Sequence, residues 1–254
     1  MPIICCLAMT DDFPVGRFDE FSLSDQSLIE LLISGFPSSK KYRDQNGDVL
    51  EITSMQGIEC NADGQVETLD ISYTRHKGSL DMRWLPPKTK RADFYGGDFK
   101  GVYDSALIPS SMKFLRLSAN SLEGNLDLTI LPTSLRFLSL SRNSITGTLN
   151  FASLSDNLQS LDVADNKICG TLNLRKVSKA IYLDAAQAYN LRFWEDHDIE
   201  FLENRICMNL ARNCFVENVL VHSIEKIEST LSFAENKCEF IVDELEQTRR
   251  IADN

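Results

Sequence analysis

The sequence contains few of the residues that acid–base or metal catalysis requires. Its 254 residues include only three histidines, His76, His197 and His222. It has no Gly-rich phosphate loop, no G-x-S-x-G nucleophile elbow and no H-E-x-x-H metal motif. The acidic cluster around His197, residues 195–198, is better interpreted as the polar start of a helix, because acidic side chains gather at helix amino ends. The sequence therefore predicts neither an enzyme nor a bound cofactor.

Cysteine occurs in no arrangement typical of a disulfide framework. The seven cysteines are an odd number without a C-x-x-C pair, and they are Cys5, Cys6, Cys60, Cys169, Cys207, Cys214 and Cys238. This usage favours reduced thiols in an intracellular, cytoplasmic protein, with an organelle left open. The nearest approach to a metal set is Cys207, Cys214 and His222, which lacks the tight ligand pair of a zinc site. No metal site is predicted.

Long hydrophobic runs and excess positive charge are missing as well. The apolar start from Ile3 to Met9 is too short to span a membrane, and neither a span nor a targeting segment is predicted. Within it, Cys5 and Cys6 leave S-acylation open as an alternative to a buried or frayed terminus. The net charge of −11 comes from 26 basic and 37 acidic residues. That balance argues against binding to nucleic acid and favours a protein partner with a basic surface.

What the sequence does contain is a repeat with a period of 23 residues. The pattern L-x-x-L-x-L-x-x-N ends at Asn120, Asn143 and Asn166, and each copy is followed by a variant of G-x-L-x-L. Alternate leucines point to one face of a short strand, which a single strand cannot bury alone, so the copies must stack. We expect the asparagine amides to satisfy backbone groups inside the turns. The glycines in phase with the repeat indicate positive φ or close backbone approach, and they are Gly78, Gly101, Gly124, Gly147 and Gly170.

This pattern resembles the leucine-rich repeat family, whose repeats each contribute one strand to a solenoid. The ending of each copy is most similar to repeats of kinetoplastid and other protist proteins, with a likeness to plant-type repeats. Residues 55–66 resemble the plant-type amino-terminal cap, although Met55 replaces its Trp and Cys60 has no nearby partner for the cap disulfide. The resemblance implies an α/β repeat fold with a short parallel sheet on its concave face and a reduced cap.

The chain divides into four predicted parts. Residues 1–21 are an amino-terminal extension, and residues 22–65 form a cap with a helix that begins near Ser24 and ends before Gly35. Residues 66–190 form a solenoid of about five to six repeats, the last of which is degraded and contains Ile181 with Ala186 at the Asn position. Residues 191–254 form a helical carboxy-terminal extension.

The carboxy-terminal extension contains a heptad-like seam of apolar residues. Its spacings of three and four residues predict a long helix from about 216 to 248. Two alternatives remain open, a helix packed as a cap on the last repeat and a coiled coil with another copy or another protein. The seam residues proposed to bind a partner are Leu220, Ile224, Ile227, Leu231, Ile241 and Leu245.

The outward side chains of the repeat strands line up in columns on the predicted concave face. Phe114 and Phe137 are expected to be exposed side by side in one column, and Asp162 and Tyr182 to be neighbours in the next. Aromatic and arginine residues dominate interface energetics, so this face is a candidate binding surface, unless the protein's own terminal segments cover it. The candidate residues are Arg91, Asp93, Tyr95, Phe114, Arg116, Phe137, Ser139, Asp162 and Tyr182.

These observations favour a non-enzymatic interaction module or scaffold that binds a protein through the concave face, the carboxy-terminal helix or both. The alternative is a structural subunit of a larger complex that docks mainly by this helix, with self-association through the seam also open. Fold alone does not decide between these functions.

Overall fold

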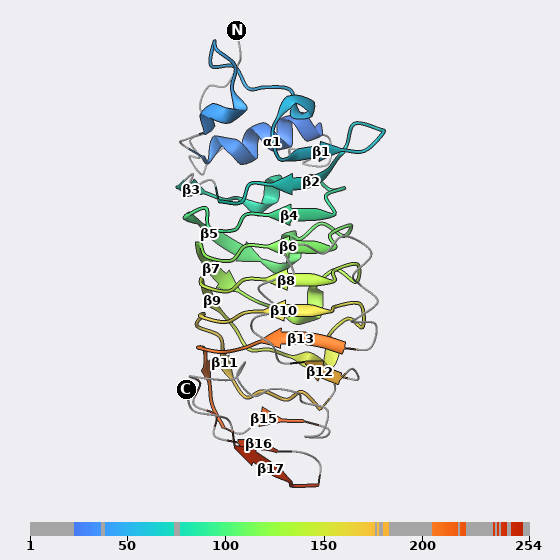
Figure 1. Cartoon of the computed structure of the whole chain (residues 1–254), viewed down its shortest axis with the longest axis vertical. Coiled ribbons are helices and arrows are strands. Elements are labelled where there is room, and N and C mark those ends of the chain that lie inside the picture. The colour runs from blue at the N-terminus through green and yellow to red at the C-terminus, as the bar shows by residue number, and fades with distance from the viewer. Residues whose placement is uncertain are drawn as a thin grey trace, which may run out of the picture.

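A computed structural model of the chain describes residues 23–36, 39–73, 77–175, 177, 180–182, 205–217, 219–221, 236, 238, 240–242 and 245–250. Several predictions fall outside these residues: the extension 1–21 with Cys5 and Cys6, the three histidines, and the seam residues Ile224, Ile227 and Leu231. The described part of the chain is an elongated stack of short strands, shown in Figure 1. Its only α-helix, α1, lies at the amino-terminal end.

The predicted solenoid forms around one eight-stranded sheet, whose outer face is the predicted concave face. Its neighbouring repeat strands are parallel and in register, so that equivalent residues pair from repeat to repeat. The inward residues at one such position, from Leu69 to Leu161, are fully buried. In spatial order the strands are β1 (Ile58–Cys60), β2 (Val66–Asp70), β4 (Arg91–Asp93), β6 (Phe114–Arg116), β8 (Phe137–Ser139), β10 (Ser160–Asp162), β13 (Arg205–Asn209) and β12 (Ala180–Tyr182).

The repeat asparagines perform the expected role in the turns. The Asn143 side chain donates to the Leu117 and Leu140 carbonyls at 2.9 Å each, and its Oδ1 accepts from the Leu122 amide at 3.0 Å. Asn166 makes the equivalent bonds one repeat further on, including one from the Ile145 amide. Each asparagine thus joins two repeats through backbone groups that would otherwise be unpaired inside the protein.

A second set of strands runs down another side of the stack. It consists of β3 (Gly78–Ser79), β5 (Phe99–Asp104), β7 (Ser121–Asn125) and β9 (Ser144–Thr146), and the pair β11 (Cys169–Gly170) and β14 (Cys214–Phe215) lies further along. The phased glycines from Gly101 to Gly170 have positive φ, as predicted. At Gly124 the reason is also steric, since a Cβ there would lie 2.2 Å from the Tyr103 carbonyl oxygen.

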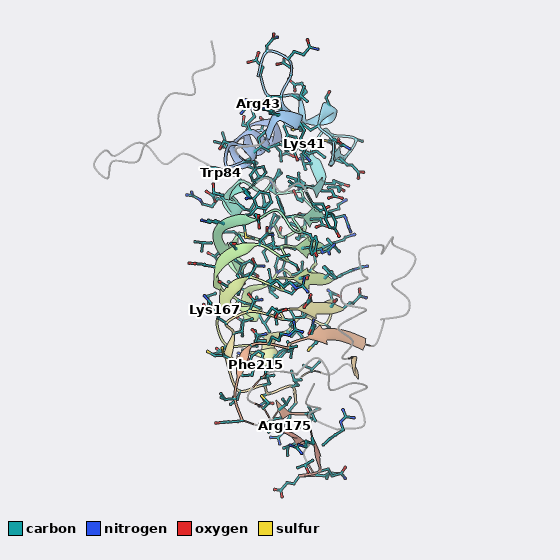
Figure 2. All side chains as sticks on the ribbon, turned by 60° about the vertical axis from the view of Figure 1, so that its left-hand side comes forward. Lys41, Arg43, Trp84, Lys167, Arg175 and Phe215 are labelled. Atoms are coloured by element: carbon teal, nitrogen blue, oxygen red, sulfur yellow. The ribbon has the colours of Figure 1, made fainter. Side chains whose placement is uncertain are left out.

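Short 3-10 helices return the chain between the two strand sets. They span Met82–Trp84, Ser105–Leu107, Leu128–Ile130 and Phe151–Ser153. Each begins after a residue whose side chain accepts a hydrogen bond from the amide two positions on, and these are Asp81, Asp104, Asp127 and Asn150. Figure 2 shows side chains filling the stack along its length, with the buried Phe215 near its carboxy-terminal part.

The helix expected after Ser24 is α1 (Asp25–Ser34). The Ser24 hydroxyl accepts from the Ser27 amide at 3.2 Å, and the buried face presents Leu28, Ile29, Leu32 and Ile33 to the first repeats. Two further 3-10 helices, Ser39–Tyr42 and Ile52–Ser54, lead into β1, which pairs antiparallel with β2. Met55 is buried at the position of the cap Trp, and Cys60 is a free thiol.

The strand beside β10 is not the one predicted. Residues 180–182 form β12, but β13 inserts between β10 and β12, as Figure 1 shows. The segment that contains β13 supplies the asparagine of the repeat. Asn213 lies four residues after the end of β13, its Nδ2 donates to the Val163 carbonyl at 3.0 Å, and its Oδ1 accepts from the Ile168 amide. The predicted sixth repeat has Ala186 at that position, and alanine has no side-chain amide.

The prediction of one continuous helix over 216–248 is wrong. Val219–Leu220 is strand β15 and Phe240–Val242 is strand β16, and the two pair in parallel. Strand β16 also pairs antiparallel with β17 (Thr248–Arg250). Asn236 continues the asparagine ladder 23 residues after Asn213, since its Nδ2 donates to the Leu210 carbonyl at 3.0 Å. The described residues of this region therefore extend the solenoid.

Candidate functional site

One column on the concave face is a stack of flat side chains. Arg91, Phe114 and Phe137 are register partners on β4, β6 and β8. The rings of Phe114 and Phe137 are stacked, with centroids 4.3 Å apart and planes 6° apart. The Arg91 guanidinium carbon lies 3.9 Å from the centroid of the Phe114 ring. Arg91 is on β4, which flanks β6 on the side opposite β8. The sequence prediction that these three residues come together is confirmed.

The exposure predicted for the two phenylalanines is wrong. Phe114 and Phe137 are each only 8% exposed, and they form a small apolar cluster separate from the main core. Each ring covers one face of the other, and the Arg91 guanidinium lies over Phe114, so little ring surface is open. The pair consequently acts as a packing element of the sheet face.

The second column contains a buried ion pair. The Arg116 Nη1 lies 3.6 Å from the Asp93 Oδ2, and the two side chains are 6% and 3% exposed. Burial raises the pKa of Asp93, against the lowering effect of the Arg116 charge. The Arg116 guanidinium also lies 4.0 Å from the centroid of the Tyr95 ring. Arg116 is thus fixed between a carboxylate and an aromatic ring, where it supports Tyr95.

Further along the same column the polar groups are hydroxyls and a carboxylate. The Ser139 hydroxyl donates to Asp162 Oδ2 at 3.2 Å and is also hydrogen-bonded to the Ser118 hydroxyl. Burial raises the pKa of Asp162, although hydrogen bonds from Ser139 and from the Ala164 amide lower it. All of these side chains are buried, so this middle part of the concave face offers no open polar surface.

Tyr182 occupies a different column from the one predicted. Because β13 inserts next to β10, the register partner of Asp162 is Asn209, while Tyr182 pairs with Cys207 in the column of Ser160. Asn209 is therefore a concave-face residue that the sequence analysis missed. The signal that could have found it is the motif Met208-Asn-Leu210-Ala-Arg-Asn213, which repeats the consensus after the intervening segment.

The amino-terminal end of the concave face carries exposed side chains. Tyr73 is 52% exposed, and its ring centroid lies 4.9 Å from that of Tyr95, with the planes tilted by 58°. Asp70 is exposed beside them, and Arg91 and Tyr95 are half-buried. Tyr73 was also missed by the sequence analysis. It stands at the turn position with positive φ, where the later repeats have Ala119, Arg142 and Asp165.

The other predicted site residues do not form a common surface. Leu220 and Ile241 lie on the neighbouring strands β15 and β16, and Leu245 is 77% exposed beyond them. Cys207 and Cys214 belong to different strand sets, and the described residues contain no group of three or more His, Cys, Asp or Glu that could hold a metal ion. None of the described helices has the length and apolar character to cross a membrane.

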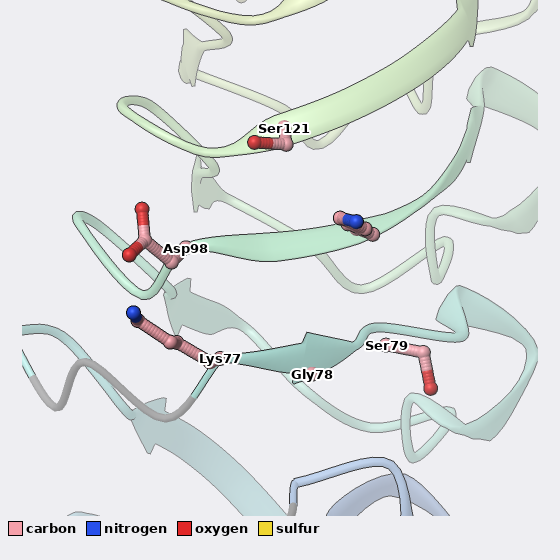
Figure 3. A pocket seen from close by; sticks show the side chains of 6 residues that line it. Lys77, Gly78, Ser79, Asp98 and Ser121 are labelled. Atoms are coloured by element: carbon pink, nitrogen blue, oxygen red, sulfur yellow. The ribbon is translucent and has the colours of Figure 1, made fainter.

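An open depression of about 550 Å³ lies on the second strand set, near its amino-terminal end. Figure 3 shows Lys77 and Asp98 at one side of it, with Ser79 on β3 and Ser121 on β7, the two strands that flank β5. Its two lysines, Lys77 and Lys100, are exposed side chains on the surface. The depression contains no buried polar group among its lining residues, so its geometry indicates no specific ligand.

Comparisons with known proteins relate the chain to solved structures only. No protein-family model and no curated protein sequence matches it. The chain is similar to a pollen receptor kinase 3 structure, with 16% identity, a TM-score of 0.53, and coverage of 76% of this chain and 85% of that one.

Two further solved structures are similar to the chain. The PEPR1-AtPEP1 structure matches at 15% identity and a TM-score of 0.53, over 85% of this chain and 35% of that one. The leucine-rich repeat ectodomain of the receptor kinase SOBIR1 from Arabidopsis thaliana matches at 18% identity and a TM-score of 0.48, over 74% and 91%. With the repeat geometry above, the likenesses to the pollen receptor kinase 3 and PEPR1-AtPEP1 structures, each with a TM-score of 0.53, support the leucine-rich repeat fold.

Proposed function

We propose that this leucine-rich repeat solenoid is a non-enzymatic interaction module that binds a protein partner at the amino-terminal end of its concave face. The observation that supports this most is the half-exposed Tyr73 ring packed against Tyr95. Tyrosine offers a large contact area with few rotatable bonds, and tyrosine and arginine are enriched among the residues that dominate binding energy. We call Asp70, Tyr73, Arg91 and Tyr95 the tyrosine site.

Buried side chains support the tyrosine site. Tyr95 contacts the guanidinium of Arg116, which is itself paired with Asp93, and both of those side chains are buried. A binding residue whose supporting contacts already exist loses little conformational entropy when a partner arrives. The buried middle of the concave face thus acts as a platform for its open end.

The charge of the protein favours a basic partner surface. The net charge is −11, and Asp70 contributes an exposed carboxylate beside the two tyrosines. Complementary charge raises the rate of association more than the final affinity. Among the solved structures, the PEPR1 structure includes AtPEP1, as its name says, and supports an interaction role by likeness of fold.

We also propose that the module works as a scaffold inside the cell. Four described cysteines, Cys60, Cys169, Cys214 and Cys238, are free thiols, which suits a reducing compartment. Docking by a long carboxy-terminal helix loses its support, because the seam residues Leu220 and Ile241 lie on strands β15 and β16.

The test compares two alanine variants of exposed side chains. The partner would be captured from cells with the wild-type chain, identified, and its Kd measured with Tyr73→Ala and with Val102→Ala. Val102 is 67% exposed on β5, so its loss removes apolar surface elsewhere. We expect Tyr73→Ala to cost about 2 kcal/mol, roughly 30-fold in Kd, and Val102→Ala to leave binding unchanged. Equal binding by both variants would reject the tyrosine site.

A further inference from the structure

Two exposed cysteines from different repeats lie opposite each other on neighbouring strands. Cys169 on β11 and Cys214 on β14 are direct register partners in a parallel pair. The Cys214 amide donates to the Ile168 carbonyl at 2.8 Å, and the Val216 amide donates to the Gly170 carbonyl at 3.1 Å, which fixes this register. Both residues are exposed free thiols, so both side chains leave the same outer side of the strand pair.

The spacing of parallel strands brings these thiols within range of a covalent bond. Neighbouring strands lie about 4.8 Å apart, and disulfides join residues whose Cα atoms are about 4.4–6.8 Å apart. The Cβ atoms of a disulfide are closer, at about 3.5–4.5 Å, so the strands must approach slightly as the bond forms. A bond formed under such strain, at an exposed position, is more easily reduced than a structural disulfide.

The position of the pair gives this bond a structural consequence. Cys169 belongs to the fifth repeat and Cys214 to the repeat of β13, and 45 residues separate them in the sequence (214 − 169). Cys214 directly follows Asn213, the residue that joins these two repeats through the Val163 carbonyl. A cross-link here would hold the β10–β13 junction closed, and a long closed loop restricts the unfolded chain strongly.

We propose that Cys169 and Cys214 are a redox-active dithiol that forms a reversible intramolecular disulfide with a low-molecular-weight disulfide as oxidant. One thiolate attacks a sulfur of oxidised glutathione, which forms a mixed disulfide and releases one glutathione thiolate. The second cysteine thiolate then attacks the protein sulfur of that mixed disulfide and releases the other glutathione. Two protein thiols are oxidised, one glutathione disulfide is reduced to two glutathione thiols, and the two protons of the protein thiols pass through solvent to the two released glutathione thiolates. The reverse exchange with reduced glutathione restores the dithiol.

The experiment treats the folded full chain with oxidised glutathione, quenches with acid, blocks remaining thiols and maps the cysteines by mass spectrometry. Trypsin cleavage after Arg175 and Arg212 separates the two cysteines, so a linked pair of peptides identifies the bond. We expect this linked pair from the wild-type chain and from Cys60→Ser, whose thiol is half-buried in the cap. Cys169→Ser and Cys214→Ser each lose it.

A thermal measurement on the same samples gives an independent result. Oxidation raises the Tm of the wild-type chain and of Cys60→Ser, dithiothreitol reverses the rise, and neither Cys169→Ser nor Cys214→Ser shows it. Three results would each overturn the proposal: both cysteines recovered as blocked thiols, both recovered as separate glutathione adducts, or cross-links only between chains. None of these results depends on the tyrosine site, so the two proposals fail separately.

Discussion

The Phe137 ring lies flat against the Phe114 ring, 4.3 Å away between centroids, on the outer side of a sheet whose inner side carries the main core. Both residues come from the same position of successive repeats, so the 23-residue period itself creates the stack. The Arg91 guanidinium continues it toward the amino-terminal end. Among the residues whose side chains are described, the concave face is therefore packed in its middle and exposed where the tyrosines stand.

Replacing Phe137 by alanine tests this buried packing. The variant loses an aromatic pair and leaves a cavity beside Phe114, so we expect the free energy of unfolding to fall by about 3 kcal/mol. Tyr73→Ala is the matched control, since a half-exposed ring at the turn contributes about 0.5 kcal/mol or less. Urea unfolding measures both. Similar small losses in the two variants would mean that Phe137 is exposed in solution.

The asparagine ladder predicts a large loss of folding stability when the side-chain amide of one asparagine is removed. In Asn166→Ala the Ile145 amide and the Leu140 carbonyl lose their side-chain partner inside the protein. Each unsatisfied buried group costs about 1–3 kcal/mol, so we expect a loss of at least about 2 kcal/mol. Asn125→Ala, on the exposed side of β7, serves as the control and should change stability little. A loss below about 1 kcal/mol at Asn166 would contradict the ladder.

Alanine substitutions at two glycines with positive φ measure the cost of backbone strain alone and the cost of strain combined with a steric clash. In Gly96→Ala the new Cβ meets open space, so only the left-handed conformation is penalised, at about 1–2 kcal/mol. In Gly124→Ala the Cβ would also lie 2.2 Å from the Tyr103 carbonyl oxygen, which forces β5 and β7 apart. We expect Gly124→Ala to lower the free energy of unfolding clearly further. Equal losses in chemical denaturation would show that the strands accommodate the methyl group.

The buried carboxyl of Asp162 makes stability depend on pH. Burial raises its pKa in the folded state above the unfolded value of about 3.9, so the folded chain binds the proton more tightly. This group therefore contributes most stability below that value and loses it as pH rises through its folded pKa. We expect Asp162→Asn to be more stable than wild type at pH 7 and to show a smaller decline between pH 4 and pH 7. Asp63→Asn, in an exposed turn, should follow wild type. Parallel pH profiles for all three chains would contradict the burial.

The repeat region could be predicted closely from the sequence because its period fixes the structural positions of several residues in each repeat. Asn120, Asn143 and Asn166 bond as expected, and the helix after Ser24 forms with its apolar face buried. Adjacent positions such as Phe114 and Phe137 were also predictable, since a fixed period places equal positions side by side. Their burial was not, because spacing along one chain contains no information on solvent access.

The carboxy-terminal part was misinterpreted because two periodicities overlap there. Leu220 and Ile241 satisfy a heptad seam, yet each also falls on a strand of the solenoid. Asn213 and Asn236 mark the true period, but the segment between Leu174 and Arg205 breaks the count from Asn166. A helix seam requires only apolar spacing, whereas the solenoid also requires an amide in each turn. The asparagines were the more specific signal.

Binding at the tyrosine site is tested most directly by a hydrogen–deuterium exchange footprint of the chain with its captured partner. We predict new protection at the two turns of the tyrosine site, residues 70–73 and 93–96, with no change over 99–104 on the second strand set. Protection confined to 236–250, or to the second strand set, would contradict binding at the amino-terminal end of the concave face.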